Sequence, residues 1–211
     1  MSADTLGRDQ IIRATVDLLD AEGTDGLSMR RLGARLGVGA TSIYWYVKSK
    51  DELVALAADE VFGEIELPDP AERGWRGAAI LIAHGLRSAA LRHPWLAPVL
   101  GTHPVYGTRI ARFQDHCLGV YEAAGFSGDD TGRAVHAVFA YVIGTTLGEA
   151  SWTAYARGDG AEERAAELAA RRRKIAARFP RLRGGARLPE SFDFGLRVVL
   201  DGLTARLAES A

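Results

Sequence analysis

The chain has 211 residues, an ordinary globular composition (47% hydrophobic, 25% charged) and a net charge of −1, so the protein as a whole is not built to bind polyanions. A single cysteine, Cys117, excludes an intramolecular disulfide and any cysteine-rich metal site. We find no signal-peptide pattern after Met1 and no apolar stretch long enough to span a bilayer, so we expect a cytoplasmic protein with no membrane partner.

Helical spacing of apolar residues begins near the N-terminus and predicts three short helices. The first covers about residues 6–22 and ends at Gly23. Ser28 is a natural N-cap for the second, and the turn Gly37-Val38-Gly39 separates it from a third helix of about residues 40–46.

A fourth helix is predicted from the capping box formed by Ser49 and Glu52, and it runs to about Phe62. Because Leu67-Pro68-Asp69-Pro70 breaks the pattern, we expect a first domain over 1–50, a connector helix over 49–63 and a second domain over 64–211.

Helical periodicity continues through the second domain, with no run of alternating strand type. Helices are predicted at about 71–92, between 94 and 104, and at about 106–124, 129–155, 161–178 and 189–208. In the first of these, five residues should face inward: Ala78, Leu81, Ile82, Gly85 and Ala89. The fold class is therefore all-α, with about nine or ten helices.

Residues 28–47 have the pattern of a helix-turn-helix, because two short amphipathic helices flank a three-residue turn that contains glycine. The second helix must enter a DNA groove about 12 Å wide, so its outer face should be polar or aromatic and not acidic. Five basic and no acidic side chains lie between residues 28 and 50, as a DNA-reading module needs. A chance cluster on a solvated face would explain the charge alone equally well.

We predict that this unit contacts the phosphates and base edges of double-stranded DNA. The predicted residues are Ser28, Arg30, Ala40, Thr41, Ser42, Tyr44, Trp45, Tyr46, Lys48 and Lys50. The alternative is that the three aromatic residues form the core of a small domain, and for Trp45 the sequence leaves both roles open.

The segment from Leu32 to Leu53 closely resembles the DNA-binding signature of the tetracycline-repressor (TetR) family in its Leu-Gly-Val turn, its Tyr44-Trp45 pair and its Val-Lys-x-Lys exit. The resemblance covers about residues 6–60. It implies a homodimer that places two helix-turn-helix heads on a palindromic operator. It also implies that helices 129–155 and 189–208 build a four-helix bundle with a second copy.

The second domain resembles the tetracycline-binding branch of that family more distantly, through Leu100-Gly101-Thr102-His103-Pro104, which is similar to a loop that borders the drug pocket. We expect a small-molecule effector to contact Ile82, Leu86, Thr102, His103, Pro104, Phe113, Asp115 and Phe139. For His103 a surface or capping role is an open alternative.

Three positions depart from that branch. Val99 stands where its metal-binding His would be, Ile82 lies near the place of its drug-binding Asn, and Gly148, beside Glu149, takes the place of its Glu. The five histidines also lack the i, i+3 or i, i+4 spacing of a zinc site. We therefore expect a more apolar pocket that does not take magnesium-bound tetracycline, and no metal or cofactor.

These features predict a ligand-responsive repressor that releases its operator when an effector binds. An activator, or a ligand-independent DNA-binding protein of the same fold, is the alternative. An enzyme is not expected, because the sequence has no nucleophile–base set, phosphate-binding loop or nucleotide fingerprint.

Overall fold

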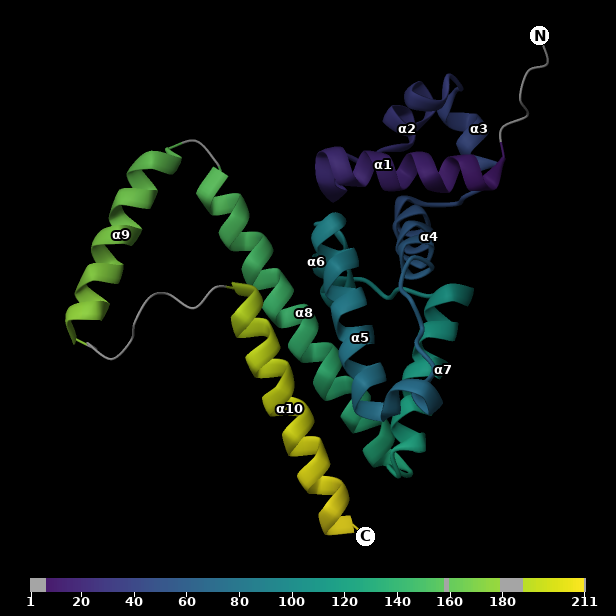
Figure 1. Ribbon diagram of the computed structural model, residues 1–211. Coiled ribbons are helices and arrows are strands. Elements are labelled where there is room, and N and C mark those ends of the chain that lie inside the picture. The colour runs from purple at the N-terminus through teal and green to yellow at the C-terminus, as the bar shows by residue number, and fades with distance from the viewer. Residues whose placement is uncertain (1–6, 158–159, 179–187, 211) are drawn as a thin grey trace.

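The computed structural model describes residues 7–157, 160–178 and 188–210, and these ranges are entirely helical apart from turns and loops (Figure 1). Ten helices are described: α1 (Arg8–Gly26), α2 (Met29–Leu36), α3 (Ala40–Tyr44), α4 (Lys50–Phe62), α5 (Pro70–Arg92), α6 (Leu96–Thr102), α7 (Thr108–Ala123), α8 (Asp129–Arg157), α9 (Ala161–Arg178) and α10 (Leu188–Ser210). The all-α prediction is confirmed, and the predicted number of helices agrees with the number described.

Helices α1 to α3 form a small unit that we call the head. The helical geometry of α1 is interrupted at Gly23, whose φ of 67° favours glycine. The sequence predicted the end of the helix at this residue, whereas α1 continues to Gly26 beyond the interruption. The Ser28 hydroxyl accepts the Arg31 N–H at 3.2 Å and caps α2. Gly33 is required by close packing, because a Cβ there would lie 2.7 Å from the Val38 carbonyl oxygen. Ile43 is fully buried, so α3 is held against the head by its inner face.

Helix α4 connects the head to the rest of the chain, which we call the body. Its first turn has the predicted capping box: Ser49 Oγ accepts the Glu52 N–H at 3.0 Å. The Glu52 carboxylate reaches back one residue further than the standard box and accepts the Lys48 N–H at 2.7 Å. The helix packs against α1 on one side and against α7 and α5 on the other.

The body is built on α8, which packs against α5, α7 and α10 (Figure 1). The inward positions predicted for α5 hold for Ala78, Ile82 and Ala89, which are buried. The prediction for Leu81 is wrong, since its side chain is 45% exposed. Leu81 directly precedes Ile82, which faces the core, and adjacent positions on a helix are rotated by about 100°. In Figure 1, α9 stands apart at the side of α8.

Candidate DNA-reading face and effector cavity

The aromatic residues after the helix-turn-helix turn lie on the outside of the head. Trp45 is 85% exposed and Tyr44 is 55% exposed, while Tyr46 is also exposed. These fractions exclude the alternative in which the three rings form the core of the head. Ile43 and Val47, which flank them, are buried and fix the orientation of this face.

The other predicted contacts are exposed or half-buried. Thr41 is exposed, and Ala40 and Ser42 are half-buried on the same short helix. Ser28 uses its oxygen as the α2 cap, which leaves its hydroxyl proton available to a phosphate. We call this surface, made of the ten residues predicted from the sequence, the reading face.

The basic side chains of this region divide into two groups. Arg31 is paired with Glu22 of α1, and Arg35 lies 3.3 Å from Asp17 of the same helix. Arg30, Lys48 and Lys50 are exposed and have no ion-pair partner among the described residues. These three cations are therefore the ones available to neutralise phosphates.

The body contains a cavity of about 440 Å³ between α4, α6, α7 and α8. Its lining residues are Phe62, Leu100, Val105, Ile110, Phe113, Gln114, Cys117, Leu118, Gly132, Val135, His136 and Phe139. A smaller cavity of about 30 Å³ lies on the α5 side, and Phe113, Cys117, Val135 and Phe139 line both. We call the two together the effector cavity.

The structure brings half of the predicted effector residues to this cavity. Phe113 and Phe139 line both parts, and Ile82 and Leu86 line the smaller part.

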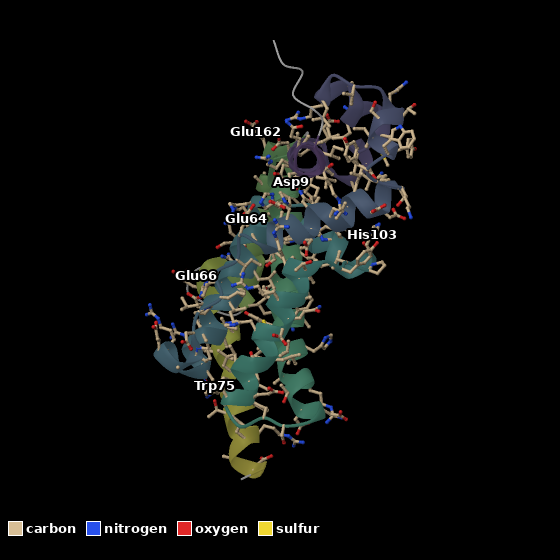
Figure 2. All side chains as sticks on the ribbon, turned by 90° about the vertical axis from the view of Figure 1, so that its right-hand side faces the viewer. Asp9, Glu64, Glu66, Trp75, His103 and Glu162 are labelled. Atoms are coloured by element: carbon tan, nitrogen blue, oxygen red, sulfur yellow. The ribbon has the colours of Figure 1, made fainter. Side chains whose placement is uncertain are left out.

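The other four predicted residues lie outside the lining, which corrects the expectation taken from the loop resemblance. Thr102, His103 and Pro104 are exposed where α6 ends, and Asp115 is exposed on the outer side of α7. The Thr102 hydroxyl is 2.7 Å from the Pro98 carbonyl oxygen and 2.9 Å from His103 Nδ1, so both polar groups are engaged with their own turn. Figure 2 shows His103 at the edge of the molecule.

Two polar lining residues, Gln114 and His136, were missed from the sequence. Both are exposed at the side of the larger part, and the rest of the lining is apolar apart from the Cys117 thiol. Gln114 follows Phe113 on α7, and His136 follows Val135 on α8, so each is next to an apolar residue that also lines the cavity. Burial raises the pKa of the Cys117 thiol to about 12, so this group is a neutral part of the wall.

A buried carboxylate ties the connector helix to the cavity wall. Asp59 of α4 accepts the backbone N–H groups of Arg109 and Ile110, both at 2.9 Å, at the start of α7. Gly107 allows this approach, because a Cβ at that residue would lie 2.1 Å from Asp59 Oδ1. Phe62 of α4 and Phe113 of α7 also meet edge to face, with ring centroids 5.0 Å apart.

Neither a metal-binding cluster nor a membrane-spanning helix is present among the described residues. No group of three or more His, Cys, Asp or Glu side chains is arranged to hold a metal ion. Among the described helices, none combines the length and the apolar character needed to cross a membrane.

Comparison with known families matches nearly the whole chain. Residues 11–63 match the model for bacterial regulatory proteins of the tetR family, and residues 67–207 match the tetracyclin repressor-like C-terminal domain. These two matches meet in the short segment between α4 and α5.

Individual proteins are similar over comparable lengths. An HTH-type transcriptional regulator of Saccharopolyspora erythraea is 38% identical over 95% of this chain and 85% of its own length. The HTH-type transcriptional repressor DrrR1 of Streptomyces coeruleorubidus is 33% identical over 97% of this chain and 80% of its own length. The crystal structure of Streptomyces coelicolor ActR in complex with actinorhodin is 26% identical, has a TM-score of 0.84, and matches 99% of this chain and 100% of that chain.

Proposed function

This chain belongs to the TetR family of DNA-binding transcriptional regulators, and from that premise we propose that it is a dimeric repressor that releases a palindromic operator when an uncharged, largely apolar effector fills the cavity. Its relatives are regulators and not enzymes. The observation that carries the proposal is the exposure of Tyr44 and Trp45 on the reading face, together with three cations of that face that have no acidic partner among the described residues.

The reading face has the chemistry of a groove-binding surface. Thr41 and Ser42 are short enough to approach base edges, and the tyrosine hydroxyls reach phosphates on either side. A ring as exposed as Trp45 gains little in the free protein, because its apolar surface remains in water, and a partner surface would bury it. We therefore assign base reading to α3 and phosphate binding to Arg30, Lys48 and Lys50.

The size and polarity of the effector are inferred from the cavity and its lining. A volume of about 440 Å³ lies within the usual range for small-molecule sites. Among the described residues, no Asp, Glu, Lys or Arg side chain lines either part, so an ionised ligand group would be desolvated without an ion-pair partner. Gln114 and His136 offer hydrogen bonds at the exposed side of the cavity. This arrangement suits an aromatic or aliphatic body with a polar group at one end.

The residues present do not fit a drug bound through magnesium, as in the tetracycline-binding branch. Val99, which stands at the expected histidine position, is buried in α6 and has no ligand atom on its side chain. Glu149 is held by Arg87, whose Nη2 lies 2.6 Å from the carboxylate. We therefore propose an effector that binds without a metal ion.

The direction of regulation is proposed as repression because one relative is a transcriptional repressor and because ActR has been crystallised with a small molecule. An effector shifts DNA binding only if it binds the two conformations with different affinity. The α4–α7 contact at Asp59 could transmit a change in the cavity to the head, since α7 lines the cavity and α4 leads to the head.

Dimerisation is proposed through α8 and α10. These helices pack against each other, and α10 leaves Phe194 73% exposed and Val198 54% exposed. Exposed apolar groups one turn apart on a helix that already packs against another are typical of a four-helix dimer interface. The second copy would supply the second head that a palindromic site requires.

The proposal is tested by measuring binding of the purified protein to DNA. Sequences selected from a random duplex library, and the region upstream of its own gene, are titrated at several salt concentrations with wild type, Tyr44→Ala and Tyr106→Ala. Tyr106 is a matched control, because it is 64% exposed and lies in the body. We expect one palindromic site, lost in Tyr44→Ala and retained in Tyr106→Ala. Failure of the wild type to select any sequence would overturn the proposal.

A further inference from the structure

The head is held to the body by a second connection besides α4. Asp20 of α1 accepts the Trp95 indole N–H at 2.7 Å, and His93 Nδ1 lies 2.8 Å from the same carboxylate oxygen. Trp95 and His93 belong to the corner between α5 and α6, more than 70 residues further along the chain. The sequence had indicated α4 as the connector and gave no sign of this contact.

Burial makes the connection specific. Trp95 is 4% exposed and His93 is 8% exposed, so both donors are withdrawn from water and depend on an internal acceptor. Hydrogen bonds to an ionised carboxylate are shorter and stronger than neutral ones, and Asp20 receives two at one oxygen. The rings of His93 and Trp95 also meet edge to face with centroids 6.2 Å apart, which fixes both donors in one orientation.

Glu64, in the segment after α4, also takes part in this contact between the head and the body. Its carboxylate lies 3.4 Å from His93 Nε2 and 2.7 Å from the Arg92 guanidinium. Burial alone would raise the pKa of Glu64, but the hydrogen bond from Arg92 and the charge of His93 lower it overall, so this carboxylate is ionised at neutral pH. Figure 2 shows Glu64 between α1 and the body. We call Asp20, Glu64, Arg92, His93 and Trp95 the head–body joint.

We propose that Asp20 is a positioning residue for operator recognition: through the joint it fixes the angle of the head on the body, so that the dimer accepts only one spacing of half-sites. This inference rests on the proposed function, because it requires two heads on one palindrome. A head attached only through α4 could rotate about that helix, whereas contacts at both α1 and α4 restrain it. Preorganisation of this kind lowers the conformational cost of binding at the correct spacing only.

The joint also connects the cavity to the head through α6, in addition to the connection through α4. Trp95 immediately precedes α6, and Leu100 of α6 lines the cavity. A displacement of α6 would therefore act on Asp20 directly, without passing through α4.

The test measures selectivity for half-site spacing. The selected operator is compared with duplexes in which one base pair is inserted at or deleted from the centre, which moves one half-site by about 3.4 Å along the axis. The quantity measured is the ratio of the dissociation constants for altered and selected spacing. We expect Asp20→Ala and Trp95→Phe to lower this ratio by about fivefold or more, because a loosened head follows the displaced half-site at little cost. The double variant should lower it no further than the stronger single variant, since both remove one contact.

Asp17→Ala is the matched control. Asp17 lies one turn before Asp20 on α1, and its carboxylate pairs with Arg35 inside the head. Thermal unfolding and gel filtration on each variant establish that it folds and dimerises. If Asp20→Ala does not fold, the spacing ratio of Trp95→Phe alone tests the proposal. A spacing ratio that stays at the wild-type value in Asp20→Ala and Trp95→Phe, or that falls equally in Asp17→Ala, overturns the proposal. A wild type that selects no DNA removes the proposed function itself, which is a different result.

Discussion

Asp59 of the connector helix and Ile110 of the cavity wall are joined by a 2.9 Å hydrogen bond from the Ile110 backbone N–H to the Asp59 carboxylate. Asp59 thereby satisfies N–H groups at the start of α7 that have no partner within that helix. One side chain thus serves as the N-terminal cap of a helix that lies 50 residues away. The connector helix and the wall of the effector cavity are therefore joined at this point.

Asp59→Asn should destabilise the fold and loosen that connection. Asparagine can keep an acceptor at Oδ1 for both N–H groups, but it puts an NH₂ group in place of Oδ2, which lies 3.5 Å from the Arg109 guanidinium. Two donors then face each other and the buried NH₂ is left without an acceptor, at a cost of about 1–3 kcal/mol. Urea unfolding measures this cost. Glu60→Gln is the control, because Glu60 pairs with Arg109 at 3.0 Å in a partly exposed position, where such a pair contributes up to about 1 kcal/mol. Equal effects of the two variants would contradict the role given to Asp59.

The sequence was sufficient to predict the elements that depend on local chemistry. Rules about neighbouring residues account for the interruption of α1 at Gly23, the Ser28 and Ser49 caps and the outward face of α3. The predictions that required distant partners were less successful. Asp20 gives no local sign that its acceptor faces Trp95, since the two are 75 residues apart.

The loop after α6 shows a second limit of prediction from the sequence. Thr102 and His103 were placed at the cavity by a short sequence resemblance, but a loop that begins at a helix end can turn either way without changing its sequence. The structure turns it outward, while the inward-facing stripes of α7 and α8 supply the wall. Phe113 and Phe139 do line the cavity, because they lie on helices whose inward faces are determined by packing against the core.

Lys48→Ala and Lys50→Ala should each weaken operator binding and reduce its dependence on salt. Each phosphate contact removed lowers the slope of log K against log salt by about 0.9. Arg35→Ala is the control, because Arg35 is already paired with Asp17 and should change the slope less. Fluorescence anisotropy over a range of salt concentrations gives the slopes. Unchanged slopes for both lysine variants would show that these cations do not meet phosphates.

Phe194→Asp should convert the proposed dimer to a monomer. A carboxylate in an apolar interface would be desolvated without a partner, whereas the same residue on a free surface would cost little. Gel filtration with light scattering measures the mass directly. Tyr106→Asp is the control, since Tyr106 is also exposed but lies outside α8 and α10. A Phe194→Asp protein that retains the mass of a dimer would remove α10 from the interface.

Glu64→Gln should reduce stability at neutral pH by less than about 1 kcal/mol, because the carboxylate is substantially exposed. The folded-state pKa of Glu64 is lowered from 4.5: burial raises it, but the hydrogen bond from Arg92 and the charge of His93 lower it more. Its contribution is therefore present above the unfolded pKa and is lost as the pH falls through the lower folded value. Urea midpoints at several pH values should converge in acid for wild type and variant. The nearby Glu66→Gln protein, altered at an exposed residue labelled in Figure 2, should show no such difference.

Cys117 offers a direct report on the effector cavity, since it lines both parts and is buried. Burial raises its pKa from 9.0 to about 12, so at pH 8 the reactive thiolate should be about a thousandfold scarcer than in the unfolded chain. A chromogenic disulfide reagent should therefore react slowly with the native protein and rapidly in denaturant. Val135→Phe, which adds volume to the shared wall, should slow the native reaction further by narrowing access. Native modification as fast as in denaturant would show that Cys117 is not shielded from water, and would contradict its place in the buried, apolar part of the wall.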